Sequence, residues 1–582
     1  MEEKKVLLSI KDLEVKFRVR GRILTAIRGI SLDIYEHESI AIVGESGSGK
    51  SVFTKTFAGM LDSNGFISNG SIIFDDEDLA ETVVPINGGT TQLMHHAQTK
   101  LDEYAPLAFG GETYREMVAL EAEKKARFTL SDEETQRYTD KIDELKFQRT
   151  EAFNLRQTLD GNKDKAQIRE ISQQISSYDE QIKKLEEEKA KAIHSHKEAA
   201  QHDSEYAKQF EARMGELKAK YEKEIAQPIT AEMKQRNEIL AKEIALSVGR
   251  YRPVKRTRAA NKLIAALREA MKLGVDLDND AERNKVFDTV AFRVRYVDET
   301  AERLHGRCVM NLANIRNTED WTQIRGKKIA TVFQDPMTSL NPILTIGNQI
   351  TSIIIKHQHC SEVEARRRAI DLMYKVGIPN PERRFDDYPF QYSGGMRQRI
   401  VIAIALSCQP KILICDEPTT ALDVTIQAQI LQLLKDLQRE LGFTIVFITH
   451  DLGVVANVAD RVAVLYAGEM VELGTVEEVF YDPRHPYTWA LLSSLPQLAQ
   501  KNTKLYSITG TPPSLYNKIV GDPFAPRNPY CLKIDSLKEP PMFKVTETHY
   551  AKTWLLDPRA PKIEKPEAID NIHEKLLAAF NI

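Results

Sequence analysis

IAIVGESGSGKS, residues 40–51, joins a short apolar run to a glycine-rich loop that ends in Lys50 and Ser51. The apolar run predicts a buried strand, and a helical pattern begins after the loop. The loop fits the pattern G-x-x-x-x-G-K-S in the strand–loop–helix setting that this pattern requires. Glycines let backbone N–H groups turn inward around phosphate groups, and the helix N-terminus attracts the same negative charge. The sequence therefore predicts a phosphate-binding loop.

The residue types in this loop predict a nucleoside triphosphate with Mg²⁺ as its ligand. In such loops the lysine reaches the β and γ phosphates and the following hydroxyl binds Mg²⁺, which assigns these roles to Lys50 and Ser51. The predicted nucleotide-binding residues of the loop are Gly44, Glu45, Ser46, Gly47, Ser48, Gly49, Lys50 and Ser51.

Two further apolar runs end in polar residues that such a site uses. KILICDE, residues 411–417, predicts a buried strand that ends in Asp416, expected to hold Mg²⁺ through water, and Glu417, expected to polarise the attacking water. The alternative is an apolar strand with solvated acids at its end. FTIVFITH, residues 443–450, predicts a third strand, ending at His450. Ligands gather at the carboxyl ends of parallel strands, so we expect His450 to contact the γ-phosphate.

Composition and charge set limits on the kind of protein. The 582 residues predict more than one domain, and a formal net charge of −4 gives no overall push toward nucleic acid. The five scattered cysteines favour a reducing compartment over a disulfide framework. We expect no signal peptide at the N-terminus. The apolar run at 400–406 is far shorter than the roughly 20 residues that cross a membrane.

Composition divides the chain into four stretches. Residues 1–82 and 317–480 show short strands and helices, whereas 83–316 is rich in Glu, Lys, Gln and Ala with helical spacing and is predicted to be an insertion. Residues 481–582 are Pro-rich and predicted to be loop-like, with a closing helix around 567–580.

The insertion contains a coiled-coil pattern. Apolar residues fall alternately three and four apart, and a turn signal at 160–164 separates two such segments. This pattern predicts an antiparallel helical hairpin, roughly 40 Å long if each arm holds about 28 residues. The positions that show the spacing are Tyr138, Ile142 and Leu145 before the turn, and Ile168, Ile171, Ile175, Tyr178, Ile182 and Leu185 after it.

A basic cluster follows the hairpin. It is interpreted first as a solvated helix face, and the alternative is contact with anionic lipid or RNA. Its members are Arg250, Arg252, Lys255, Arg256, Arg258 and Lys262.

YSGGMRQR, residues 392–399, resembles the signature motif L-S-G-G-Q of ABC ATPases, with Tyr in place of Leu and Met in place of Gln. It lies some twenty residues before the 411–417 strand, as in that family. The resemblance implies an α/β fold, a P-loop NTPase of the ABC nucleotide-binding type. Such a domain has a RecA-like core, an antiparallel β subdomain and a helical subdomain. Here it would carry the inserted α-helical, coiled-coil domain and the C-terminal extension.

The resemblance also implies roles for single residues. Gln334 looks like the Q-loop glutamine, which touches Mg²⁺ and the transporter partner, and 421–423 looks like the D-loop. His450 looks like the switch histidine that promotes hydrolysis with Glu417. Phe17 matches the aromatic residue that stacks on adenine, although an ordinary core residue of a strand is the alternative. Ser393, Gly394 and Gly395 would cap ATP bound to a partner subunit.

Finer matches point to one subfamily. QDPMTSLNP at 334–342, HPYT at 485–488 and DPFAPRNPY at 522–530 resemble D-type ATP-binding subunits of oligopeptide permeases. This resemblance implies a peripheral protein at the cytoplasmic face of the membrane, where it drives uptake of oligopeptides. It implies a second ABC subunit, expected to be F-type, with two transmembrane permease subunits and an extracellular substrate-binding protein. We expect no nucleic-acid partner.

Two departures from the subfamily lead to further expectations. Many relatives carry four cysteines in the C-terminal extension that can hold an iron–sulfur cluster, and the matching positions here are Asp522, Asn528, Asp535 and Thr553. Because such clusters are held by thiolates, we expect no iron–sulfur cluster. The insertion separates the phosphate loop from the Q-loop, so its ends near 81 and 317 must lie close together.

Two other functions stay open from the sequence. Soluble ABC ATPases that act on DNA or RNA also carry coiled coils. In those proteins the coiled coil usually follows the Q-loop and is longer, and they lack the extension seen here. An importer for dipeptides or nickel is the other alternative, because this type of subunit does not touch the solute.

Overall fold

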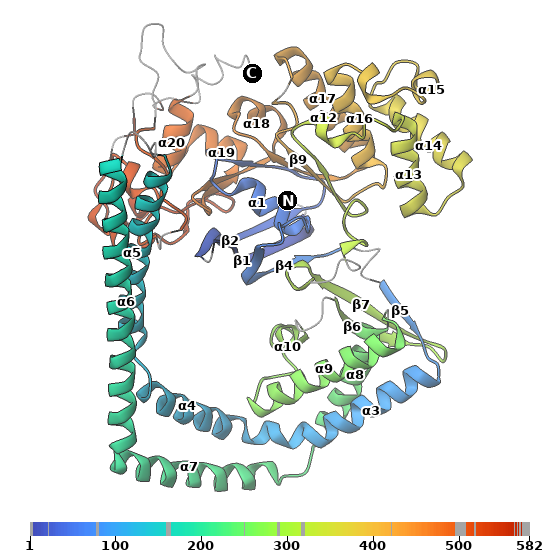
Figure 1. Ribbon diagram of the computed structural model, residues 1–582. Coiled ribbons are helices and arrows are strands. Elements are labelled where there is room, and N and C mark those ends of the chain that lie inside the picture. Colours follow the sequence, from blue (N-terminus) through green and yellow to red (C-terminus); the bar gives the residue numbers. More distant parts are fainter. Residues whose placement is uncertain are drawn as a thin grey trace. The chain divides into compact units, whose positions relative to one another are not determined.

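The fold is seen in a computed structural model (Figure 1). It describes residues 4–20, 22–76, 81–158, 165–249, 251–287, 292–315, 321–420, 422–494, 508–516, 519–563, 565–566, 569 and 572. The chain forms two compact units. Unit 1 comprises residues 1–84 and 290–582, and unit 2 comprises residues 85–289.

The larger sheet of unit 1 places one group of parallel strands side by side. In the described part of the chain its order is β13-β14-β12-β11-β3-β10-β9-β8. The pairs β11–β3, β3–β10, β10–β9 and β9–β8 are parallel, and β11–β12 is antiparallel. The strands are β3 (Ser39–Val43), β8 (Ile329–Val332), β9 (Ile412–Asp416), β10 (Thr444–Ile448), β11 (Arg461–Tyr466), β12 (Glu469–Thr475), β13 (Phe543–Lys544) and β14 (Tyr550–Ala551).

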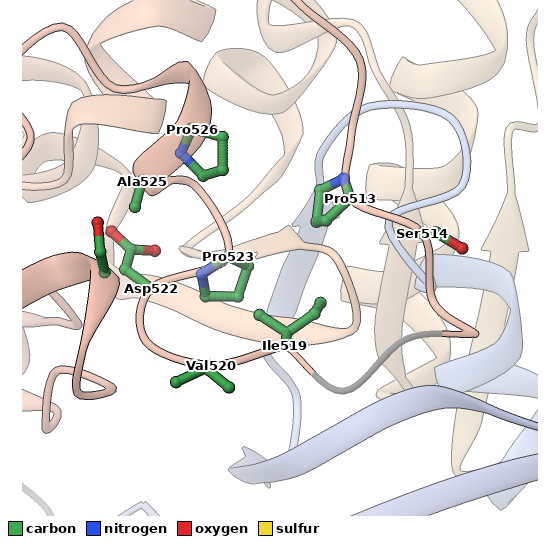
Figure 2. Close-up of a pocket in the computed structure, with 9 residues that line it drawn as sticks. Pro513, Ser514, Ile519, Val520, Asp522, Pro523, Ala525 and Pro526 are labelled. Atoms are coloured by element: carbon green, nitrogen blue, oxygen red, sulfur yellow. The ribbon is translucent and has the colours of Figure 1, made fainter. Parts of the chain in front are cut away.

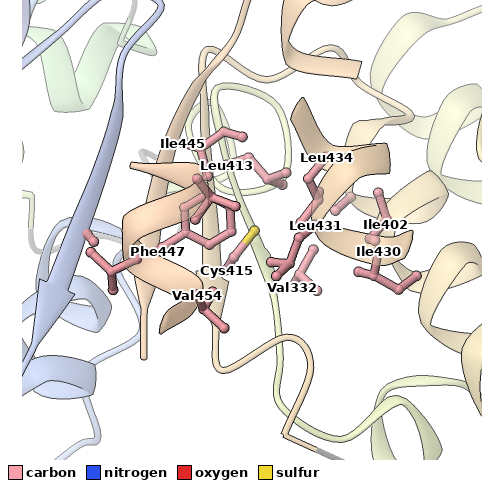
Figure 3. Packing of buried hydrophobic residues seen from close by; sticks show 14 of the residues in the cluster. Val332, Ile402, Leu413, Cys415, Ile430, Leu431, Leu434, Ile445, Phe447 and Val454 are labelled. Atoms are coloured by element: carbon pink, nitrogen blue, oxygen red, sulfur yellow. The ribbon is translucent and has the colours of Figure 1, made fainter. Parts of the chain in front are cut away.

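Helices of unit 1 cover this sheet with apolar side chains. Every residue of β3 and β10 is buried, as expected for strands that are covered on both faces. Leu413 and Phe447 from the strands lie with Leu434 of α17 in one hydrophobic cluster (Figure 3). The described α-helices of unit 1, of which α14 and α15 pack on other helices, are α1 (Lys50–Phe57), α12 (Pro336–Ser339), α13 (Ile346–Gln358), α14 (Glu362–Lys375), α15 (Pro381–Arg384), α16 (Gly394–Leu406), α17 (Val424–Leu441), α18 (Leu452–Val458), α19 (Val476–Tyr481) and α20 (Pro486–Ser493).

The second sheet of unit 1 is the antiparallel subdomain. Its order is β2-β1-β4-β7-β5, with β6 paired to β7. In β2 the side chains of Ile30, Leu32 and Ile34 are buried at every second position, which is the period of a strand with one face on a core. The strands are β1 (Val6–Val19), β2 (Arg22–Tyr35), β4 (Gly65–Phe74), β5 (Glu81–Pro85), β6 (Phe292–Glu299) and β7 (Arg303–Asn311).

The end of the expected helical insertion is instead part of this sheet. Residues 83–316 were expected to be helical, but β6 and β7 lie in this range and β7 pairs with β4, Ile73 opposite Asn311. Burial in β7 alternates along most of the strand, so its period is two and not 3.6. β5 and β7 are also neighbours, so the chain leaves and re-enters unit 1 at one sheet. Of the expected ends, 81 lies in β5, whereas 317 lies outside the described residues.

Unit 2 is built of helices. Leu240 and Ile244 of α8 and Leu263 and Leu267 of α9 are fully or almost fully buried. The amide of Asn237 donates a hydrogen bond of 2.8 Å to Asp102, which ties α8 to α3. The helices are α3 (Gly88–Tyr104), α4 (Gly111–Arg127), α5 (Asp132–Thr158), α6 (Lys165–His202), α7 (Ser204–Ile225), α8 (Ala231–Val248), α9 (Pro253–Lys272) and α10 (Asp280–Phe287).

The predicted helical hairpin is present as α5 and α6. Ile142, Ile171 and Ile182 are buried in its seam, and an ion pair links Arg149 to Asp179. The turn predicted at 160–164 lies outside the described residues. The 38 residues of α6 exceed the expected arm of about 28 and span about 57 Å at 1.5 Å per residue.

The antiparallel arrangement continues beyond this hairpin into α4 and α7. The guanidinium of Arg127 lies 3.7 Å from the ring centre of Tyr206, and the rings of Tyr114 and Tyr221 lie 5.9 Å apart. Helices α4 and α5 therefore run antiparallel to α6 and α7. We call residues 111–225 the arm.

The remaining expectations concern the basic cluster, the C-terminal helix and membrane-spanning helices. The described members of the basic cluster lie at or within the start of α9 and are mostly exposed, as expected for a solvated face, and Arg250 is outside the described residues. Most of the predicted helix at 567–580 is also outside them. Searched over its described residues, the chain has no helix long and apolar enough to span a membrane.

We predict that unit 1 folds without the arm. A Cβ at Gly110 would lie 3.1 Å from the side chain of Ile225, so a short Gly-Ser linker can replace residues 112–224. We expect helical circular dichroism to fall while the thermal transition of unit 1 keeps its midpoint. A large fall in that midpoint would show that unit 1 depends on the arm.

Candidate active site

The phosphate loop begins where the buried strand β3 ends. Gly44 has a φ of 151°, and a Cβ there would lie 2.2 Å from the carbonyl oxygen of Leu465. Gly49 caps α1 with a φ of 100°, a conformation that other residues adopt at a cost. The loop backbone therefore takes a path that only glycine permits at these two positions.

Lys50 spans the loop that it follows. Its ammonium donates hydrogen bonds of 2.7 Å to the carbonyl oxygen of Gly44 and 3.0 Å to that of Glu45. Burial lowers the pKa of Lys50, and the nearby charges of Glu417, Asp416 and Glu45 oppose this effect. A buried cation at a helix N-terminus is suited to a polyanionic ligand.

Ser51 and Asp416 form the part of the site that fits a divalent cation. The hydroxyl of Ser51 donates a 3.3 Å hydrogen bond to Oδ1 of Asp416 across the ends of α1 and β9. Burial raises the pKa of Asp416, and the charge of Glu417 adds to this, whereas the Ser51 hydrogen bond lowers it. Hydroxyl and carboxylate oxygens are the ligands that Mg²⁺ prefers, so these two residues fit the ion.

Glu417 is the centre of a second cluster. Its carboxylate lies 3.0 Å from Nδ1 of His450 and accepts a 3.1 Å hydrogen bond from the amide of Gln334. The hydroxyl of Thr420 donates another at 3.1 Å. Glu417 has a φ of 47°, and its N–H donates to the carbonyl of Ile448 at 2.9 Å, which holds this less common backbone conformation.

These residues meet because their strands are neighbours. The loop follows β3, His450 follows β10, Glu417 follows β9 and Gln334 follows β8, and these strands are adjacent and parallel in that order. All four segments therefore leave the same edge of one sheet. The structure brings together Lys50, Ser51, Asp416, Glu417, His450 and Gln334.

The signature residues occupy a different place. Ser393 caps α16, where its hydroxyl accepts a 3.3 Å hydrogen bond from the N–H of Met396. Ser393 and Gly394 are exposed at this helix N-terminus, and Gly395 lies against Ile426. In the D-loop, Ala421 is outside the described residues, and the carboxylate of Asp423 caps α17.

Phe17 lies in β1, on the antiparallel sheet. Its side chain is partly buried, and a Cβ at Gly65 would lie 2.7 Å from its ring. It pairs with Leu24 of β2 and Gly65 of β4. Its assignment to adenine stays a prediction.

Sequence reasoning missed three groups that contact the phosphate loop or Glu417. They are Thr420 beside Glu417, and Tyr487 and Arg527 on Glu45. The tail segments that hold Tyr487 and Arg527 were recognised only as markers of a subfamily. Nothing local indicates their contacts, because Arg527 lies 482 positions from Glu45 in the sequence.

Comparison with known families agrees with this geometry. The family model described as "ABC transporter" matches residues 27–262 and 298–420, which is more than half of the chain. The chain belongs to the ABC transporter family. A second model, "Oligopeptide/dipeptide transporter, C-terminal region", matches residues 471–534. The α/β fold of unit 1 is thus that of an ABC ATPase.

Several curated proteins resemble this ABC ATPase over less than half of its length. The oligopeptide transport ATP-binding protein AmiE of Streptococcus pneumoniae is 67% identical over 266 residues, 46% of this chain and 75% of AmiE. The oligopeptide transport ATP-binding protein OppD of Bacillus subtilis is 59% identical over 263 residues, 45% of this chain and 74% of OppD. The dipeptide transport ATP-binding protein DppD of Lactococcus lactis is 57% identical over 260 residues, 44% of this chain and 74% of DppD.

The four positions that match the iron–sulfur cysteines of relatives carry side chains with oxygen atoms and no thiolate. All four side chains are buried and accept local backbone hydrogen bonds, for example Asp522 from Phe524 at 2.9 Å and Asp535 from Leu532 at 2.6 Å. Cys531 is exposed. Iron–sulfur clusters need cysteine thiolates, so these residues do not fit one.

Asp522 borders a pocket of about 320 Å³ in the C-terminal extension (Figure 2). Pro513, Ile519 and Pro523 line it as well. Asp522 is 3% exposed, and its Oδ2 has no hydrogen-bond partner among the described residues. Burial raises the pKa of Asp522 to about 7, and the charge of Asp535 adds to the shift. Below this pH, the Asp522 carboxyl is therefore mostly neutral in the folded protein.

We predict that Asp522 makes stability fall as pH rises from 4 to 7. The folded pKa of about 7 lies above the ordinary aspartate pKa of 3.8, so the folded state binds the extra proton in this window. The unfolding free energy of the wild type minus that of Asp522→Asn should drop by at most about 4 kcal/mol and then level off. Denaturant titrations at each pH measure it.

Asp557→Asn is the matched control for this experiment. Hydrogen bonds from Arg559 lower the pKa of Asp557 to about 2, so its effect on stability should be constant between pH 5 and 8. A flat difference for Asp522→Asn over the same range would contradict the raised pKa.

Proposed function

We propose that this chain is the ATP-hydrolysing subunit of an importer that takes up oligopeptides, bound peripherally at the cytoplasmic face of the membrane. The ATPase activity is supported by one observation. Lys50, Asp416, Glu417 and His450 lie together at one edge of the main sheet. The names of AmiE and OppD, together with the C-terminal region match, support oligopeptides as the transported solute.

ATP binds, in this proposal, with its phosphates on the loop of residues 44–51. Lys50 exchanges its bonds to the loop carbonyls for the β and γ phosphates, since a charged acceptor makes the stronger hydrogen bond. Ser51, Asp416 and Gln334 would hold Mg²⁺, which when bound neutralises charge on the phosphate oxygens. Phe17 would stack on adenine.

Glu417 acts on the attacking water. Its carboxylate orients and polarises the water next to the γ-phosphate, and His450 and Gln334 keep the carboxylate in place. His450 is well exposed, so its side chain can turn from Glu417 to the γ-phosphate when ATP is bound. Catalysis then depends on positioning and charge, as in other phosphoryl transfers.

A second ABC subunit completes the site. Ser393 and Gly394 stand exposed at the start of α16 and the half-buried Gly395 follows them, so backbone N–H groups at this helix N-terminus are available to the ATP of a partner. We propose that this partner is an F-type subunit and that two membrane permease subunits and an extracellular substrate-binding protein complete the system. Closure on ATP and reopening after hydrolysis would drive the permease between its two states.

Uptake by cells tests the proposed solute. A strain lacking this chain should lose uptake of labelled tetrapeptides and regain it with the wild type but not with Glu417→Gln. Unchanged peptide uptake with lost nickel uptake would support the metal importer instead. Co-purification of nucleic acid, without membrane proteins, would support the soluble ATPase.

We predict that Glu417→Gln binds ATP but hydrolyses it at least about 100-fold more slowly. The amide keeps the shape of the side chain and loses the negative charge that polarises water, an effect worth 10²–10⁴-fold in general-base catalysis. Steady-state phosphate release measures the rate of hydrolysis, and retention of ATP on the protein measures binding.

Glu547→Gln is the control for this variant. Glu547 is exposed beside β14, at the other end of the sheet from β9. Hydrolysis by Glu417→Gln at the rate of this control would remove Glu417 from the proposed mechanism.

A further inference from the structure

We propose that the C-terminal extension tunes ATP affinity at the phosphate loop, with Arg527 neutralising Glu45 and Tyr487 fixing the loop backbone. Both are positioning residues, and the inference rests on the proposed ATP-binding function. The extension would then be part of the nucleotide site and not only a subfamily marker.

Arg527 makes a two-pronged ion pair with the phosphate loop. Two of its guanidinium nitrogens donate to the two carboxylate oxygens of Glu45, at 2.8 and 3.2 Å. This parallel arrangement is the strongest geometry for an arginine–carboxylate pair. The side chain of Arg527 is only 5% exposed and that of Glu45 is 26% exposed, so the pair is shielded from solvent on the arginine side.

The remaining donors of Arg527 fix its position. It donates to the hydroxyl of Tyr466 at 3.1 Å and to the carbonyl oxygen of Thr509 at 3.1 Å. One side chain therefore ties together the phosphate loop, β11 and two segments of the extension. The guanidinium is held before any nucleotide binds.

Tyr487 holds the backbone of the same loop residue. Its hydroxyl oxygen accepts a 2.7 Å hydrogen bond from the N–H of Glu45, and its side chain is fully buried. The rings of Tyr466 and Phe524 lie 4.6 and 5.4 Å from its ring, centre to centre. Tyr487 stands in the first turn of α20, where the imidazole of His485 accepts from its N–H at 3.0 Å. The ring has no room to move away from the loop.

The charge of Glu45 explains why the loop needs Arg527. Glu45 lies next to Lys50, whose ammonium donates a 3.0 Å hydrogen bond to the Glu45 carbonyl oxygen, so the loop that would receive the triphosphate also carries a carboxylate. Unpaired, this carboxylate would repel the phosphates in a poorly screened site. Arg527 cancels it, and the pair leaves the positive charge of Lys50 for the ligand.

The hydrogen bond from the Glu45 N–H to Tyr487 reduces the conformational entropy that the loop loses when ATP binds. Three glycines of the loop, Gly44, Gly47 and Gly49, have positive φ, and unrestrained glycines lose the most freedom on ordering. Tyr487 holds the N–H of Glu45, while Lys50 and the N–H of Ser48 bond its carbonyl oxygen. A loop held at its second residue has less freedom left to lose when ATP binds.

Two variants of the full-length chain distinguish the effect of an unpaired Glu45 charge from the effect of losing the ion pair itself. Arg527→Gln breaks the ion pair and leaves Glu45 negative, so the Kd for Mg-ATP should rise about tenfold, with KM changing more than kcat. Glu45→Gln breaks the same pair but leaves the positive charge, so the Kd should change less, or in the opposite direction. Isothermal titration with Mg-ATP and steady-state hydrolysis measure these effects.

Arg559→Gln is the matched control. Arg559 lies in the same extension and pairs with both oxygens of Asp557, but it is 84% exposed. Its replacement should leave the Kd unchanged. Tyr487→Phe keeps the buried ring and removes only the acceptor of the Glu45 N–H, and it should raise the Kd severalfold at wild-type thermal stability.

Each outcome decides for or against the proposal. Equal losses of affinity in Arg527→Gln and Glu45→Gln, or no loss in Arg527→Gln, would overturn the charge role. If Arg527→Gln fails to fold, Arg527→Lys keeps the charge without the two-pronged geometry, and wild-type affinity there supports neutralisation whereas a tenfold loss opposes it. A wild-type chain that does not bind Mg-ATP would overturn the proposed function as well.

Discussion

The parallel pairing of β3 with β10, β9 and β8 is the constraint on which the site depends. Each of these strands ends in a different polar group, and none of the groups is useful alone. Parallel pairing puts all their carboxyl ends at one edge of the sheet. All residues of β3 and β10 are buried, so the core covers both faces of these central strands and keeps them inside the sheet. The chemistry therefore rests on the hydrophobic core in Figure 3.

Unit 2 can be inserted because its two ends meet at one sheet. β5 leads out of unit 1 and β7 returns beside it, so the insertion need not separate the strands on either side. Within unit 2, the arm folds back on itself, which brings its own ends together at Gly110 and Ile225. Long insertions with adjacent ends cost little loop-closure entropy. Among the described residues of the arm the buried apolar side chains are few and include Ile142, Ile171 and Ile182, as in the narrow seam of a two-stranded coiled coil.

The C-terminal extension contacts the rest of unit 1 at several places. β14 adds to the edge of the main sheet beside β12, and the pair of Arg527 and Glu45 reaches the phosphate loop. The buried rings of Tyr466, Tyr487 and Phe524 pack together, and the hydroxyl groups of the two tyrosines contact Arg527 and Glu45. The buried polar side chains at the four cluster-type positions accept local backbone hydrogen bonds, as Asp522 does from Phe524 and Asp535 from Leu532.

The sequence alone determined the features whose physical cause is local. The phosphate loop could be predicted because its glycines and apolar strand are adjacent, and the α5–α6 hairpin because its apolar spacing repeats over many residues. Asp416, Glu417 and His450 could be placed at strand ends for the same reason. β6 and β7 were missed because a charged segment with alternating burial resembles a polar helix until its neighbouring strand is known.

Only the tertiary structure decided which distant groups meet. The contact of Gln334 with Glu417 depends on the order of strands in the sheet, which no local pattern encodes. The contacts of Tyr487 and Arg527 with Glu45 join residues more than 440 positions apart. An arginine in a Pro-rich tail looks like any solvated charge until packing brings it beside a carboxylate, because the strength of such a pair depends on its geometry and on the desolvation that burial imposes, and not on its sequence neighbours.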